Sequence, residues 1–133
     1  MQITAKVVSS SATHQVSVRT GEADQALSIA AKRDGRGSAV NGGEFLMLAL
    51  ATCYCNDLYR EAQRLGIPID GAEVEASAEF PGIGLAATGI TYRARVHSSA
   101  PAEDVQRLLR ETDAVAEIHN TVRAGVPVQL VVE

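Results

Sequence analysis

The chain contains one strongly apolar stretch, and the predicted elements are arranged around it. Ten consecutive residues, Phe45–Tyr54, have a single weakly polar member, Thr52, and lie in a segment at 43–65 that predicts a helix. Gly66 then supplies a left-handed stop. Because its first half is apolar nearly all round, we expect that half to be enclosed by the rest of the molecule. The second half becomes polar from Asp57, and we expect it to reach the surface.

Alternating polar and apolar residues predict strands on both sides of this helix. The runs before the helix are rich in Val, Ile and Thr, and a long Gly-rich loop leads into it. The expected elements are strands at 1–8, 14–20 and 25–31, a loop at 32–43, strands at 67–80 and 90–97, helices from about 99 and about 113, and a strand at 126–132. This order predicts an α+β fold with an antiparallel sheet rather than alternating βαβ units.

Composition and charge restrict the class of protein. The 133 residues fit one domain over 1–133, small enough that a buried central helix gains from a partner chain. A net charge of -4 disfavours nucleic acid or an anionic membrane as the partner. The apolar run at 45–55 is too short to cross a bilayer, so we expect a soluble protein. Two cysteines, two residues apart, suit a reducing cytoplasm and free thiols.

The candidate chemistry lies on the apolar helix and in the loop before it. Cys53 and Cys55 are the two thiols of the chain, and the Gly-rich approach to the helix carries Arg33, Arg36 and Glu44. Two cysteines without a second pair do not form a zinc site, and the histidines lack a second ligand in register. We therefore expect no metal and no cofactor.

The segment at 43–53, an acid followed by a Leu- and Ala-rich helix that ends at a cysteine, resembles the OsmC/Ohr family of osmotically induced and organic hydroperoxide resistance proteins. The Glu-rich strand and the last helix leading to 125–128 match in order, so the resemblance covers most of the chain. It implies antiparallel sheets wrapped around a long buried central helix in an intertwined homodimer. It also implies thiol-dependent reduction of organic hydroperoxides at Cys53. In the family an Arg, here Arg33 or Arg36, lowers the pKa of the thiol, and an acid, here Glu44, holds that Arg.

Two features depart from the family pattern. Active relatives keep a second cysteine in a Cys-Pro-x-Ser pattern, but the corresponding place is Ala116, followed by Glu117 and, two residues further on, His119. A sulfenic acid at Cys53 then needs an external thiol, because Cys55 points about 200° away on a helix and cannot form a bridge without unwinding. His119 is a candidate for a substituted site group that uses acid–base chemistry, or an ordinary core residue.

The second departure is the position of the acid. Glu44 precedes Cys53 by nine residues, which on one straight helix is about 13 Å of rise and the opposite face. Glu44 therefore serves Cys53 either from the loop before the helix or at the Cys53 of a partner subunit.

The sequence leaves open whether the chain is an enzyme. The first hypothesis is a hydroperoxide reductase that uses Cys53 and an external reductant. The second is a binder of a small apolar ligand at a dimer-interface pocket, suggested by the missing second cysteine. The third is a redox or sulfur sensor in which Cys53 or Cys55 carries a sulfenate or persulfide.

Overall fold

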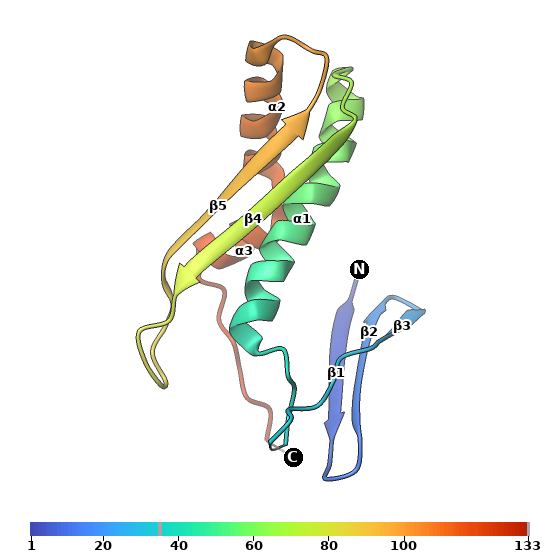
Figure 1. The fold of residues 1–133 in the computed structure, drawn as a ribbon, viewed down its shortest axis with the longest axis vertical. Coiled ribbons are helices and arrows are strands. Elements are labelled where there is room, and N and C mark those ends of the chain that lie inside the picture. Colours follow the sequence, from blue (N-terminus) through green and yellow to red (C-terminus); the bar gives the residue numbers. More distant parts are fainter. Residues whose placement is uncertain (35, 133) are drawn as a thin grey trace. The chain divides into compact units, whose positions relative to one another are not determined.

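The computed structural model describes residues 1–34 and 36–132, and the chain divides into two compact units, Met1–Phe45 and Leu46–Glu133. In chain order the elements are β1 (Ile3–Ser9), β2 (His14–Thr20), β3 (Ala23–Leu27), α1 (Gly42–Leu65), β4 (Gly71–Glu79), β5 (Thr88–His97), α2 (Ala102–Val115) and α3 (Glu117–Ala124). Figure 1 follows this order along the chain. The order of elements and the antiparallel strand pairing confirm the predicted α+β class with antiparallel sheets. The single domain predicted over 1–133 stays a prediction.

The N-terminal unit is built on an antiparallel sheet with the order β1-β2-β3. Gly21, with a φ of 57°, allows a tight turn after Thr20, so Thr20 pairs directly with Ala23. The third strand therefore starts at Ala23 and ends at Leu27, and the predicted range of 25–31 is wrong at both ends. Gly35, which the sequence predicts to lie in the loop at 32–43, is outside the described residues.

The core of the C-terminal unit forms around the second half of α1. One helical face carries apolar side chains at spacings of four, and this face packs against α2 and against the partly buried side chains of the β4–β5 hairpin. The buried members of the core are Tyr54, Leu58, Ala62, Ile67, Leu108 and Ala116. In the hairpin, Tyr92, Ala94 and Val96 are partly buried and alternate with exposed residues, as predicted.

In the single chain most buried residues of α1 lie in its second half, and enclosure of the first half with the help of a partner chain stays a prediction. Leu48 in the apolar first half is 57% exposed, whereas Leu58 is fully buried and Asp57 is only 5% exposed. Hydrophobicity alone predicts the reverse. The order is inverted because the hairpin and α2 cover α1 where the core forms, and ion pairs with Arg60 and Arg64 compensate the buried Asp57 and Glu61.

The last two helices are separated at Ala116, whose backbone is extended with φ of -72° and ψ of 107°. The sequence predicts a second helix from about 113, but α2 continues to Val115 and α3 begins at Glu117. Gly125, with a φ of 61°, ends α3 in the left-handed conformation as predicted. The break at Ala116 is important for the site, because it sets where the first residue of α3 points.

The closing strand predicted at 126–132 does not form in the single chain. Within residues 1–34 and 36–132, none of the strands pairs with this segment. Its apolar side chains are exposed, with Val128 at 98% and Leu130 at 89%. Alternation can identify a strand-forming segment, but a strand also needs a neighbouring edge to accept its hydrogen bonds. None of the described helices combines the length and the apolar character needed to cross a membrane.

Candidate functional site

Cys53 lies near the middle of α1, against the core of the C-terminal unit. It is a free thiol, its side chain is partly buried, and it packs against the cluster that contains Tyr54 and Leu58. The helix places Asp57 on the same face four residues later, and Cys53 Sγ lies 3.7 Å from Asp57 Oδ2. The thiol and a nearly buried carboxylate therefore share one side of α1.

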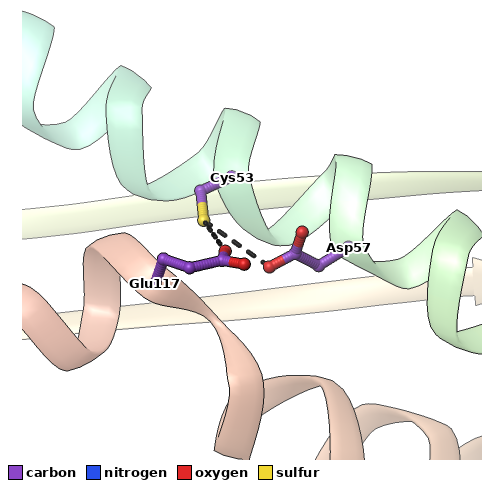
Figure 2. A group of neighbouring side chains, drawn as sticks. All are labelled: Cys53, Asp57 and Glu117. Carbon is purple, nitrogen blue, oxygen red and sulfur yellow. Dashed lines mark hydrogen bonds between the residues drawn. The ribbon is translucent and has the colours of Figure 1, made fainter. Parts of the chain in front are cut away.

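A second carboxylate reaches the thiol from α3. Glu117 is the first residue after the break at Ala116, and its Oε2 lies 3.7 Å from Cys53 Sγ. Figure 2 shows the two carboxylates next to each other on one side of the sulfur, with a dashed line from the sulfur to one oxygen of each. Ala116 is fully buried and is the place where active relatives are expected to carry their second cysteine. That position is next in the chain to a residue that contacts Cys53.

Arg60 supplies the positive charge of this cluster. Its Nη1 lies 2.9 Å from Asp57 Oδ1 and 3.6 Å from Glu117 Oε1, so one guanidinium bridges α1 and α3. The Arg60 side chain is about half exposed, at 50%, so water screens these pairs. Two carboxylates therefore face one cation. The oxygens that Arg60 does not contact, Asp57 Oδ2 and Glu117 Oε2, face the thiol.

The charges around Cys53 favour the neutral thiol. Burial raises the pKa of the Cys53 thiol above that of a free thiol, and the negative charges of Asp57 and Glu117 add to this, against a backbone hydrogen bond from Ile118 that lowers it. Burial, with a hydrogen bond to Glu117, also raises the pKa of the Asp57 carboxyl. The pKa of Glu117 is lowered, first by hydrogen bonding to the backbone of its own helix start. The site therefore pairs a protonated thiol with a carboxylate of raised basicity.

The residues predicted from the sequence fall into both units. Arg33 and Arg36 are exposed in the segment between β3 and α1. Glu44 lies in the first turn of α1, where it forms a capping box with Asn41: Glu44 N–H donates to Asn41 Oδ1 at 2.8 Å, and Asn41 N–H donates to Glu44 Oε1 at 3.0 Å. These residues belong to the N-terminal unit and Cys53 to the other, so their pairing with Cys53 stays a prediction.

The residues that surround the thiol carry only weak signals in the sequence. The spacing of four between Cys53 and Asp57 is a helical signal that places both on one face. The spacing of three residues between Asp57 and Arg60 is a second helical signal of this kind. Glu117, 64 residues from Cys53 in the chain, has no local signal. Cys55 is also free and partly buried, and the structure assigns it no site contact within the described residues.

A second feature of the C-terminal unit is a buried histidine among aromatic rings. His119 on α3 is 3% exposed, and its ring centroid lies 4.5 Å from that of Tyr92 and 5.8 Å from that of Tyr54. Neither ring nitrogen has a hydrogen-bond partner among the described residues. Burial lowers the pKa of His119. A small cavity of about 140 Å³ adjoins it, lined by Leu50, Ile90, Tyr92, His119, Val122 and Arg123.

The hydroxyls and charges next to this histidine are paired. The Tyr92 hydroxyl donates to Asp113, whose Oδ1 also accepts from Arg123 Nη2 at 2.6 Å. The Tyr54 hydroxyl donates to the backbone oxygen of Leu109 at 2.8 Å, and burial raises the pKa of Tyr54 to about 12. His119 is therefore the unsatisfied member of an otherwise satisfied polar group.

The donor atoms of Cys53, Asp57 and Glu117 lie within 4.8 Å of one another, a spacing at which side chains can bind a metal ion. Arg60 already faces both carboxylates as their cation. The guanidinium contacts Asp57 Oδ1 and Glu117 Oε1 and so supplies a positive charge at this cluster, while the other oxygen of each carboxylate faces the sulfur.

Several solved structures share the fold. An OsmC-like protein from Mycoplasma pneumoniae has a TM-score of 0.65 and 17% identity, with 92% of this chain and 86% of that chain covered. An organic hydroperoxide resistance protein OsmC from Legionella pneumophila has a TM-score of 0.63 and 15% identity, with 92% and 90% covered. The organic hydroperoxide resistance protein OhrB of Bacillus subtilis has a TM-score of 0.59 and 20% identity, with 92% and 93% covered. Among curated protein sequences, none matches the chain.

The family itself is settled by a sequence model. The model described as OsmC-like protein matches residues 35–131, which is well over half of the chain. That range contains α1 with Cys53, the β4–β5 hairpin and both later helices. The resemblance first seen at 43–53 therefore extends through every element that builds the site, and the chain belongs to the OsmC-like protein family.

Proposed function

We propose that this protein reduces organic hydroperoxides through the thiol of Cys53 and is regenerated by an external thiol. The observation that carries the proposal is a free, partly buried cysteine of an OsmC-like chain, with two carboxylate oxygens 3.7 Å from its sulfur to take part in proton transfer. Membership of the family supports it, as do the relatives in Legionella pneumophila and Bacillus subtilis that are named for hydroperoxide resistance.

The chemistry requires a reductant from outside the chain. The sulfur attacks the outer oxygen of the peroxide, the O–O bond breaks, and Cys53 becomes a sulfenic acid while the alcohol leaves. The usual second cysteine is replaced by Ala116, and Cys55 lies two residues away on the same helix, where a disulfide would require local unwinding. A first external thiol therefore condenses with the sulfenic acid and releases water. A second external thiol then restores Cys53 and leaves as a disulfide with the first.

We further propose a homodimer in which Glu44, with Arg33 or Arg36, serves a Cys53 site. The exposed apolar residues of the first half of α1 and of 126–132 support an interface between two copies, with Leu48 at 57% and Val128 at 98% exposed in the single chain. Light scattering at micromolar concentration should give the mass of a dimer. A monomer would contradict this part of the proposal, and cytoplasmic localisation likewise stays a prediction.

Peroxide consumption tests the proposed reaction. We expect the protein to consume t-butyl or cumene hydroperoxide with dithiothreitol or a dihydrolipoyl donor as reductant, and the Cys53→Ser variant to lose this activity. The matched control is Cys55→Ala, which removes the other thiol and should leave the activity in place. Unchanged consumption by Cys53→Ser, or none by the unaltered protein, would contradict the proposal.

A second candidate function is the binding of a small apolar ligand. The observation that favours it is the cavity of about 140 Å³ at His119, whose walls are largely apolar and whose histidine has no hydrogen-bond partner in the described chain. A relative from Vibrio cholerae, at 20% identity, has a molecule of captopril bound in one of its active sites. Native mass spectrometry of protein purified without refolding should then detect a bound small molecule, and an empty protein would count against it.

A further inference from the structure

We propose that Asp57 is the general base of this site: its carboxylate takes the proton of the Cys53 thiol while the sulfur attacks the peroxide, and then returns that proton to the leaving oxygen. This inference rests on the proposed function. It answers a difficulty within the C-terminal unit, where the charged groups that contact the sulfur are two carboxylates, which oppose formation of a free thiolate. Reaction from the neutral thiol avoids that difficulty only if a nearby group accepts its proton.

Geometry favours Asp57 over Glu117 for this role. Both carboxylates have an oxygen 3.7 Å from Cys53 Sγ. However, the Asp57 side chain is 7% exposed and Glu117 is 65% exposed. Asp57 is also fixed to the thiol by the spacing of one helix, while Glu117 reaches over from α3. A general base works best when its pKa approaches the working pH, and burial shifts the Asp57 carboxyl in that direction.

The remaining charges keep the pair in place. Arg60 contacts Asp57 Oδ1 at 2.9 Å, and Oδ2 is the oxygen that faces the sulfur. The same guanidinium contacts Glu117 Oε1, while Oε2 faces the sulfur. Arg60 therefore occupies one oxygen of each carboxylate and leaves the other directed at Cys53. Glu117 and Arg60 are positioning residues in this scheme.

The proposed step balances without a further reactant. A new S–O bond forms between Cys53 Sγ and the outer oxygen of the hydroperoxide as the O–O bond breaks. The thiol proton passes to Asp57 Oδ2 and from there to the departing alkoxide, which leaves as the alcohol. The sulfur is oxidised by two electrons to a sulfenic acid, the peroxide is reduced by two electrons, and Asp57 ends as the carboxylate it was at the start.

Two reactions of Cys53 separate a general base from a simple like charge. Alkylation by iodoacetamide requires the thiolate alone, whereas the proposed peroxide reduction requires proton transfer. Asp57→Asn removes the charge and the base together. We expect alkylation at pH 7 to rise about fivefold, as for a charge about 4 Å away acting through water. We expect single-turnover peroxide reduction to fall by about 100-fold, the lower range for loss of a general base.

Matched variants complete the experiment, all in a Cys55→Ala background so that Cys53 is the one thiol. Glu117→Gln removes an equal charge from the same sulfur but keeps Asp57, so alkylation should rise, while peroxide reduction should fall far less than the loss of about 100-fold expected for Asp57→Asn. Glu75→Gln changes the net charge equally on the exposed face of β4 and should alter neither rate. The unaltered protein should also react with peroxide more slowly in D2O than in H2O, a test that does not depend on a variant that folds.

The outcomes are distinct. If Asp57→Asn accelerates both reactions, Asp57 only repels the thiolate and the inference is overturned, while the proposed function stands. Equal peroxide rates in D2O and H2O overturn it in the same way. If the unaltered protein consumes no peroxide, the proposed function fails and the general base fails with it. Opposite changes in alkylation and peroxide reduction support Asp57 as the base.

Discussion

Replacing His119 with Phe should stabilise the protein. The histidine is 3% exposed, it packs against Tyr92 and Tyr54, and neither of its ring nitrogens has a partner among the described residues. A phenyl ring keeps the aromatic packing and removes the buried polar atoms. The adjoining cavity of about 140 Å³ provides space for the slightly larger ring.

The size of the effect follows from the cost of an unsatisfied buried polar group. That cost is about 1–3 kcal/mol, so we expect the free energy of unfolding at pH 8 to increase by an amount in this range. For a chain of 133 residues this corresponds to about 3–4 °C in Tm for each kcal/mol. The gain should grow at lower pH. Burial and then Arg123 lower the pKa of His119, with Asp113 opposing them.

The lowered pKa of His119 sets the sign of this pH dependence. A base whose pKa is lower in the folded state binds a proton more readily when unfolded, so its contribution to stability is present above the unfolded value of about 6.5 and is lost as the pH falls through the folded one. The unaltered protein loses stability in this window and His119→Phe does not. The difference between the two proteins should therefore be larger at pH 5.5 than at pH 8.

Urea unfolding at fixed protein concentration at both pH values measures this difference. The matched control is His97→Phe, because His97 is 58% exposed on β5 and its replacement should change stability by no more than about 0.5 kcal/mol. If His119→Phe destabilises the protein, the ring nitrogens are satisfied by a ligand, by water or by a second copy of the chain. That result would refute the assignment of His119 as an unsatisfied buried group and strengthen the ligand-binding candidate.

Three further predictions concern the core and the thiol. Leu58→Ala, at a fully buried position, should lower the free energy of unfolding, measured in urea, by about 3–5 kcal/mol. The control Leu85→Ala, at a position that is 61% exposed, should lower it by less than about 1 kcal/mol. Equal losses would place the core elsewhere. In a Cys55→Ala background the iodoacetamide rate should titrate at a higher pH than that of a free thiol, because burial, Asp57 and Glu117 raise the pKa of Cys53. The stability associated with the neutral thiol should be present below the unfolded pKa and lost as the pH rises through the folded pKa. A titration below that of a free thiol would contradict the described charges. In the Ala116→Cys variant the new cysteine should form a disulfide with Cys53 under oxidising conditions. The disulfide closes a loop of about 60 residues and should stabilise the chain by about 4 kcal/mol in the loop-entropy model. Three free thiols, counted by mass spectrometry, would show that the two sulfurs do not meet.

The sequence carried the information for the elements and for the family. The helix at 43–65 and the strand at 14–20 are predicted nearly to the residue, because Gly66 stops the helix and strict alternation marks the strand. The run at 43–53 identified the family, and Ala116 identified the missing cysteine. These are local signals, each contained within a few turns or strands of chain.

The surroundings of Cys53 were decided by tertiary structure. The Asp57 side chain lies near Cys53 because of helical spacing, which the sequence contains, but its burial is a property of the folded chain. Glu117 comes from 64 residues away and reaches the sulfur only because the chain breaks its helix at Ala116. The segment at 126–132 illustrates the same limit, since the sequence predicts a strand there but none of the described strands pairs with it. Local periodicity fixes what a segment can form, and the packing of distant segments fixes which charges a buried thiol meets.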